Sequence, residues 1–334
     1  MKEIEAPALP APPSLMAALK GGFDATASRV TLIAFPLVLD LLIWLGPHLQ
    51  IRQIVESFSR QFSSLAATNS PQTAEALQAN QELWTIIGER LNLMVLLRTY
   101  PVGIPSLMAS RLPLETPFAI KTINWDLSTI TGALGVWLFL NFVGLVVASL
   151  YFVKVAHTVV PGKGSQPFLG EWLWAAAQVI LLTLVWGILL LGVSIPASCM
   201  ISALTFTNPS LGRFALLLFG GGLIWMIFPL LLSPHGIFVN RNNALVSLKK
   251  GVRVTRMTLP TTGLFFLAAL VLTQGLDILW KVPPETSWFT LVGVLGHAFI
   301  TTGLLASSFI YYKEADQWTQ KMLSYWAQAP KARA

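Results

Sequence analysis

Four polar side chains stand inside long apolar stretches of the sequence: Asp40, Asp277, Asn141 and His297. An ionisable group within the hydrocarbon layer of a membrane is costly, so such a group is by default a candidate for function. Asp40 follows Arg29 by about 16 Å along a helix, which places its carboxyl group deep in the apolar layer. There it relays protons, binds a cation, or stays protonated and hydrogen-bonded to a neighbouring helix. The sequence leaves these three roles open.

The other three residues have a weaker claim to chemistry. We expect Asp277 near the outer interface of the membrane, where it reaches water and has a structural role. Asn141 and His297 are expected to form hydrogen bonds to neighbouring helices, contacts worth roughly 0.6–2 kcal/mol each. If the segments around Asp40 and Asp277 pack as a pair, both carboxylates line one outer-facing cavity.

Known catalytic and metal-binding patterns are absent from the sequence. It contains no phosphate loop of the Walker type, no His-Glu-x-x-His and no Gly-x-Ser-x-Gly. The four histidines include no pair at the i, i+4 spacing of a helical metal site, and the single Cys199 excludes a cysteine-built site. We therefore predict neither an enzyme nor a metal centre, and the sequence identifies no cofactor.

A basic segment at Asn243–Arg256 has the pattern of an amphipathic surface helix. Leu245, Leu248 and Val252 share one arc at about 100° per residue, and basic residues flank them. Such a helix lies among lipid headgroups, where each cation contributes about 1 kcal/mol near anionic lipid. The same charges are also explained if they only set the topology. We assign contact with lipid headgroups or a protein partner to four residues: Lys249, Lys250, Arg253 and Arg256.

Composition indicates the elements that must position these residues. Hydrophobic residues make up 54% of the chain and charged residues 11%, whereas a soluble domain carries about 25% charged residues. Runs of roughly 20 apolar residues cross the hydrocarbon core as helices. We predict an all-α, polytopic membrane protein with six spans, at 30–47, 128–153, 172–195, 213–234, 259–280 and 287–312.

The distribution of Lys and Arg predicts the direction of the spans. Basic residues concentrate around one set of span ends, and the short loops at the other ends offer only Arg213 and Lys281. Positive charges mark the cytoplasmic side, so we expect both termini in the cytoplasm of a bacterium and the spans in its inner membrane. The net charge of +7 then requires no nucleic-acid partner. The expected partners are membrane lipids and other membrane proteins.

These boundaries divide the chain into three parts. Residues 1–13 are predicted to be a disordered tail, residues 14–312 the six-span domain, and residues 313–334 a cytoplasmic amphipathic tail. The segment 48–127 lies outside the cytoplasm. It is predicted to hold a helix over about 51–65, a second helix from Gln72 to about Arg98, and a Pro-rich connection over 100–117. This hairpin and its Pro-rich connection are either a passive cap or a docking surface.

A short pattern occurs twice, each time before a predicted span. It is Leu19-Lys20-Gly21-Gly22 followed by Thr26, and Leu248-Lys249-Lys250-Gly251 followed by Thr255. The longer stretch Ile237–Arg256 resembles a pattern in several broad bacterial multi-span families, among them the membrane domain attached to some glycerophosphodiester phosphodiesterases. The resemblance implies an accessory membrane domain. It carries over no catalytic residue, because this sequence lacks the soluble phosphodiesterase domain.

Two functions follow as hypotheses. The first is a non-catalytic membrane subunit or accessory component of a larger assembly, which docks through the outer hairpin or the cytoplasmic helices. The second is a transporter or permease-like protein for a lipid-like or apolar substrate, coupled through Asp40. The duplicated pattern favours the second, because transporters are often built from repeats.

Overall fold

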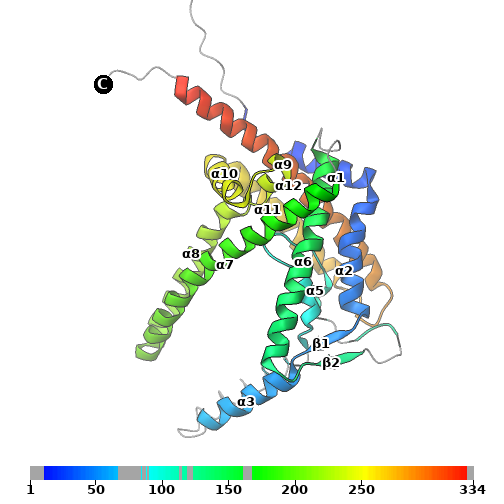
Figure 1. Cartoon of the computed structure of the whole chain (residues 1–334), viewed down its shortest axis with the longest axis vertical. Coiled ribbons are helices and arrows are strands. Elements are labelled where there is room, and N and C mark those ends of the chain that lie inside the picture. The colour runs from blue at the N-terminus through cyan, green and yellow to red at the C-terminus, as the bar shows by residue number, and fades with distance from the viewer. Residues whose placement is uncertain are drawn as a thin grey trace, which may run out of the picture. The chain divides into compact units, whose positions relative to one another are not determined.

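The computed structural model describes residues 11–66, 84, 88, 90–112, 115–118, 123–160 and 168–328. Within these ranges five helices are long and apolar enough to cross a membrane. A sixth crossing is counted if α1 (Leu15–Ser28) and the segment Val30–Leu45, which meet at a bend of 92°, form one span. The chain is therefore helical, with helix lengths and composition compatible with a membrane protein (Figure 1).

Each of the five long helices overlaps one predicted span, and four of them extend past at least one predicted end. The five helices are α6 (Ile130–Val159), α7 (Phe168–Thr207), α8 (Pro209–Ile227) with its continuation to Asn240, α11 (Leu259–Trp280) and α12 (Thr290–Gln328). Since α12 continues through Gln328, the predicted tail over 313–328 is part of the last helix, while residues 329–334 lie outside the described ranges.

Two predicted spans differ from the structure at their ends. The prediction that a helix ends near residue 195 is wrong, because α7 accommodates Pro196 and continues to Thr207. The span predicted over 30–47 corresponds to a helical segment over Val30–Leu45 that is not one regular α-helix. Residues Val30–Ile33 form a 3-10 helix, η1, and α2 covers only Ala34–Leu45, about 18 Å of rise.

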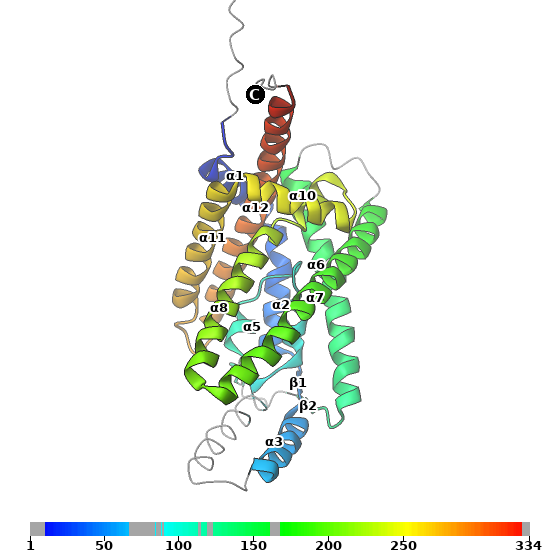
Figure 2. The ribbon, with the colours of Figure 1, turned by 90° about the vertical axis from the view of Figure 1, so that its left-hand side faces the viewer.

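The described chain divides into two compact units. Unit 1 comprises Met1–Arg29, Phe152–Leu270 and Gly303–Ala334. In it α7 and α8 form a long hairpin (Figure 2), and α10 (Ala244–Met257) packs against α9 (His235–Asn240) and η4 (Phe228–Leu230). Three mutually packed rings fill the interior of this unit: Phe152, Phe238 and Phe309.

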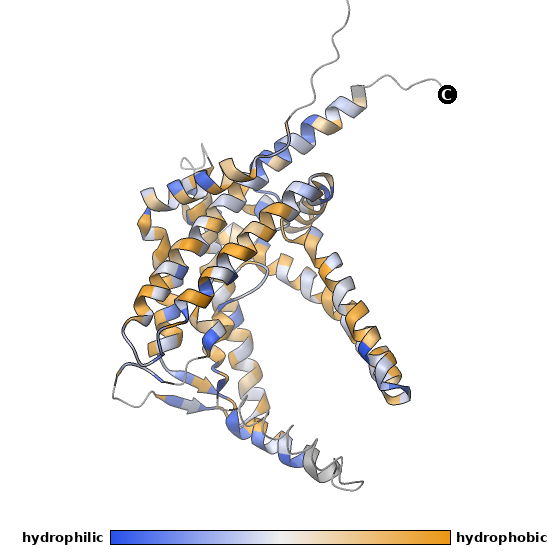
Figure 3. Cartoon of the chain, turned by 180° about the vertical axis from the view of Figure 1, so that it is seen from behind, coloured by the Kyte–Doolittle hydropathy of each residue, from blue (hydrophilic) through white to orange (hydrophobic). Residues whose placement is uncertain are grey.

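Unit 2 comprises Val30–Tyr151 and Val271–Thr302. It contains the only two strands among the described residues, β1 (His48–Gln50) and β2 (Asn124–Asp126), which pair in parallel. The sequence did not predict them. The helix predicted over 51–65 is confirmed as α3 (Arg52–Ala66). Figure 3 shows that α3 carries many hydrophilic residues, whereas the α7–α8 hairpin is largely hydrophobic.

Residues 99–112, which we call the strap, belong to the core of unit 2. Val102 and Leu107 are fully buried, and α5 (Met108–Arg111) is a single helical turn within the strap. The second predicted outer helix is wrong at its end, because Leu93–Leu97 form a 3-10 helix, η2. Most of the rest of that predicted helix lies outside the described residues.

Candidate functional site

Asp40 lies on α2 and ties the strap to that helix. Its Oδ1 accepts hydrogen bonds from the Ser106 hydroxyl at 2.5 Å and from the Met108 amide at 2.9 Å, and its Oδ2 accepts one from the Leu107 amide at 3.1 Å. The amides at the start of a helix have no partner within it, so the carboxylate satisfies donors that α5 cannot. Asp40 is fully buried. These hydrogen bonds hold the strap against α2.

Asp277 of α11 and His297 of α12 form a second buried pair in unit 2. The His297 Nδ1 lies 2.7 Å from the Asp277 Oδ1, and both side chains are more than nine-tenths buried. The prediction that His297 bonds to a neighbouring helix is confirmed. Asp277, however, was predicted to reach water, and instead its side chain is enclosed by protein.

His297 interacts with both carboxyl groups. His297 lies close enough to Asp40 for an electrostatic interaction, in addition to its hydrogen bond with Asp277. Its Nε2 is buried and has no hydrogen-bond partner among the described residues. Three helices thus bring three ionisable groups into one region, an arrangement able to exchange a proton or to hold a small polar group.

An apolar groove lies beside the Asp40 anchor. The groove has a volume of about 420 Å³, within the size range of small-molecule sites. Its walls are formed by residues of α2, η2, the strap and α6. Leu39 and Leu42 contribute from α2, and Ile104 contributes from the strap. Gly144 of α6 allows this close packing, because a side chain there would collide with the Leu97 carbonyl at 2.6 Å. Every lining residue is apolar: Ala34, Phe35, Val38, Leu39, Leu42, Leu97, Ile104, Val143, Gly144 and Val147.

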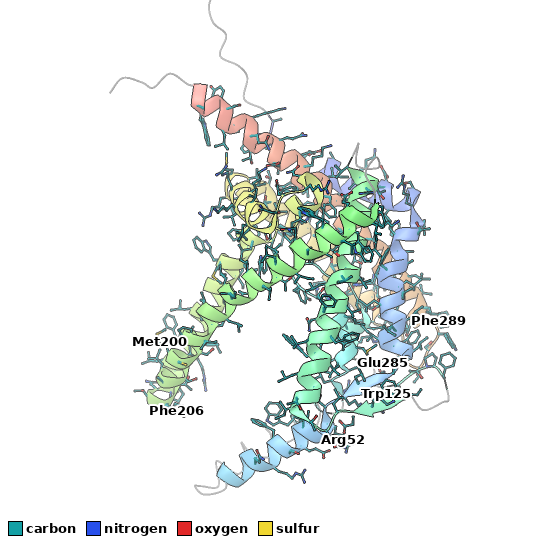
Figure 4. The ribbon with its side chains drawn as sticks, in the orientation of Figure 1. Arg52, Trp125, Met200, Phe206, Glu285 and Phe289 are labelled. Carbon is teal, nitrogen blue, oxygen red and sulfur yellow. The ribbon has the colours of Figure 1, made fainter. Side chains whose placement is uncertain are left out.

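The strap has a second anchor that sequence reasoning missed. Arg111 donates from Nη2 to the Pro283 carbonyl at 2.7 Å, and its Nε lies 3.9 Å from Glu285. The Trp44 indole of α2 donates to the Glu285 carbonyl at 3.1 Å. The turn between α11 and α12 (281–289, Figure 4) therefore holds both α2 and the end of the strap. These partners are distant in sequence and have no shared spacing that predicts them.

The remaining polar candidates have local or structural partners. Asn141 donates to the Trp137 carbonyl at 2.8 Å on its own helix, so the predicted bond to a neighbouring helix is wrong. His157 lies 2.8 Å from Glu171, and His235 lies 2.8 Å from Ser308. No group of three metal-ligating side chains occurs in the part of the chain that the structure describes.

The four basic candidates lie on α10 in unit 1. Lys249, Arg253 and Arg256 are exposed, whereas Lys250 is half-buried and its Nζ lies 3.5 Å from the Asn242 side-chain oxygen. The predicted helix is confirmed as α10, and a different face from the Leu and Val arc packs against the protein. The buried residues of α10 are Ala244, Ser247, Gly251, Val254 and Thr255.

Comparisons with known proteins add no family to this description. No family model matches the chain, and no curated protein or solved structure matches it either.

Proposed function

We propose that this chain is a non-catalytic integral membrane protein that binds a lipid-like, apolar molecule in the groove beside α2. It is permease-like, and Asp40 couples binding or movement of that molecule to protonation. The observation that carries the proposal is the shared wall. The strap that Asp40 anchors also lines the groove through Ile104.

The coupling follows from the chemistry of the anchor. A carboxylate forms stronger hydrogen bonds than a neutral acceptor does, and Asp40 accepts three of them from the strap. A proton added to the carboxyl group removes its charge and occupies one acceptor position. The strap then loses part of its attachment to α2, and the wall of the groove is released.

The topology proposed with this function has six spans, with the bent pair of α1 and Val30–Leu45 as the first. The ends of the described chain, 11–29 and 303–328, both belong to unit 1, which supports termini on one side. The basic residues of α10 favour the cytoplasmic side of a bacterial inner membrane.

Filling the groove tests the binding proposal. Val38 lines the groove and is 61% exposed, while Ile188 of α7 is 74% exposed and does not line it. We expect Val38→Trp to weaken binding of a fluorescent long-chain phospholipid analogue to the purified protein about tenfold or more, since the indole occupies the groove. Ile188→Trp, the matched control, leaves binding unchanged. Equal affinity in wild type and Val38→Trp would remove the groove from the proposal.

The coupling role of Asp40 needs a second measurement. In proteoliposomes with an imposed pH gradient, we expect Asp40→Asn to abolish the pH dependence of transbilayer movement of the same analogue. Ser106→Ala removes one anchor bond and is expected to reduce that dependence partly. Circular dichroism establishes that both variants are folded. A flux that responds to pH equally in all three proteins would exclude the coupling.

A second function is favoured by a different observation, the exposure of the α7–α8 hairpin. In the most apolar stretches of these helices only 17% and 11% of the residues are buried, as low as the 17% of α11 and below the 44% of α6 and 61% of α12. Partner helices that cover this hairpin would make the chain a membrane subunit of a larger assembly. Its mass after purification in mild detergent tests this function, because a stable monomer without co-purifying chains contradicts it.

A further inference from the structure

Helix α10 is held in a fixed orientation on unit 1. Gly251 packs directly on the backbone of Ser233, where a Cβ would lie 2.5 Å from the Ser233 Cα. The Ser247 hydroxyl donates to the Ser233 carbonyl, and Asn243 caps the helix by accepting from the Val246 amide at 2.9 Å. Two tight contacts and a cap leave this helix little freedom to rotate, so one defined face points away from the unit.

Helix α1, which carries the other copy of the repeated pattern, is seated in the same way. Gly22 packs on the backbone of Ser307, as Gly251 packs on Ser233. The Thr26 hydroxyl donates to the Gly22 carbonyl at 2.9 Å, and the Thr255 hydroxyl donates to the Gly251 carbonyl at 3.0 Å. The repeated Leu-Lys-x-Gly-x-x-x-Thr pattern therefore fixes a surface helix at two places in unit 1, and each copy presents its lysine outward.

The exposed face of α10 combines cations with apolar side chains. At 100° per residue, five exposed residues fall within an arc of about 100°, opposite the buried face. They are Leu245, Val246, Lys249, Arg253 and Arg256. The helix contains no acidic residue, whereas α1 carries Asp24 and only one lysine. The two helices are therefore packed through equivalent contacts but differ in charge.

We propose that the exposed face of α10 binds the headgroups of anionic phospholipids, with Lys249, Arg253 and Arg256 contacting phosphate. Leu245 and Val246 insert between the headgroups beside these cations, as the apolar side chains of interfacial helices do. A face that is merely solvated needs no exposed leucine or valine next to its cations. Long cationic side chains extend to phosphate while their stems lie along apolar surface.

Anionic lipid stabilises a protein to which it binds, and this effect gives the test. The full chain is placed in nanodiscs of phosphatidylcholine alone or with phosphatidylglycerol, and its thermal unfolding is followed. We expect phosphatidylglycerol to raise the Tm of the wild type, and about 0.5 M NaCl to reduce the rise. Lys249→Ala, Arg253→Ala and Arg256→Ala combined should weaken the affinity for this lipid about 100-fold, since each cation near an anionic surface contributes roughly fivefold.

The α1 copy supplies the matched control. Lys20→Ala combined with Arg29→Ala removes two exposed cations from the same unit and should leave most of the rise in Tm. Replacement of the three α10 cations by the other basic residue (Lys249→Arg, Arg253→Lys and Arg256→Lys) should retain it. The Tm in phosphatidylcholine reports whether each variant is folded.

The result that overturns the proposal is a rise in Tm that is the same in the triple alanine variant and the wild type. A second overturning result is no rise with phosphatidylglycerol together with a rise on addition of soluble polyglutamate, because the face would then bind acidic protein segments. The proposal concerns unit 1 alone, so it stands or fails independently of the groove beside α2.

Discussion

Asp40 and Asp277 occupy similar settings in the sequence, yet their partners in the folded chain differ in kind. Asp40 bonds the strap, 66 or more residues away in the sequence, and Asp277 bonds an imidazole on the next helix. The sequence identifies Asp40 and Asp277 as candidates because their neighbours are apolar. It does not identify Ser106, because a serine next to a proline belongs to no periodic pattern. Only tertiary packing brings Ser106 to Asp40. The candidate carboxylates were thus predictable, and their roles were not.

His48 in β1 gives a prediction at the same scale. Its side chain is 2% exposed, and burial lowers the pKa of His48 below its ordinary value of 6.5, against a smaller opposing effect of a backbone hydrogen bond to Ile43. The unfolded chain therefore binds a proton at a pH where the folded chain does not. The free energy of unfolding is therefore highest above pH 6.5, where neither the folded nor the unfolded chain binds this proton. It falls as the pH drops from 6.5 towards the folded-state pKa, by up to about 1.4 kcal/mol per pH unit.

Thermal unfolding between about pH 7.5 and pH 5 measures this effect. We expect the wild type to lose stability on acidification and His48→Gln to lose less, because Gln cannot take up the proton. The difference between the two proteins isolates His48 from the other histidines. Parallel pH profiles would show that His48 does not contribute.

Among the secondary-structure elements, the long helices were predictable and their interruptions were not. Apolar runs identify α6, α8, α11 and α12 because length and hydropathy are properties of the local sequence. The span predicted over 172–195 stops before Pro196, but α7 continues through this proline to Thr207, as membrane helices tolerate. A Pro-rich connection was predicted over 100–117, but its attachment to unit 2 is made by the hydrogen bonds of Asp40 and Arg111. Those bonds join residues that have no local relation.

The repeated helices α1 and α10 give the prediction at this scale. We expect Gly22→Ala and Gly251→Ala each to destabilise the protein by about 1–3 kcal/mol, the usual cost of overpacking. The added methyl groups would clash with the backbone of Ser307 and of Ser233. A clash with backbone cannot be removed by rotating a side chain. Thermal unfolding in detergent measures both changes.

Two other helical glycines are the controls. At Gly135 and Gly263 an added methyl group would have no described atom within 4 Å apart from the neighbouring backbone of its own helix. Alanine at either site should leave stability unchanged or raise it by about 0.4–1 kcal/mol. A loss of similar size in all four variants would mean that the cost reflects glycine in general and not the tight seats of α1 and α10.

At the scale of the whole molecule, the α7–α8 hairpin has a large exposed apolar surface. Helix α7 has 40 residues, about 60 Å, which is twice the hydrocarbon thickness of a bilayer. Met200 and Phe206 near its end are 61% and 91% exposed (Figure 4). A strong tilt or a covering partner accommodates such a length. Helices in lipid associate through packing and polar contacts, so a partner would lie along this hairpin.

Cys199 is the single cysteine of the chain, and its exposed position on α7 makes it a natural probe of that partner. We expect a photoreactive maleimide on Cys199, activated in native membranes, to form an adduct heavier than the 36.5 kDa chain. Mass spectrometry then identifies a second copy or another membrane protein. For the control, Phe289→Cys is combined with Cys199→Ser. Phe289 is 74% exposed in the turn between α11 and α12, and the same label there should give little adduct. Lipid adducts alone from Cys199, or equal protein capture from both positions, would exclude the hairpin as the assembly surface.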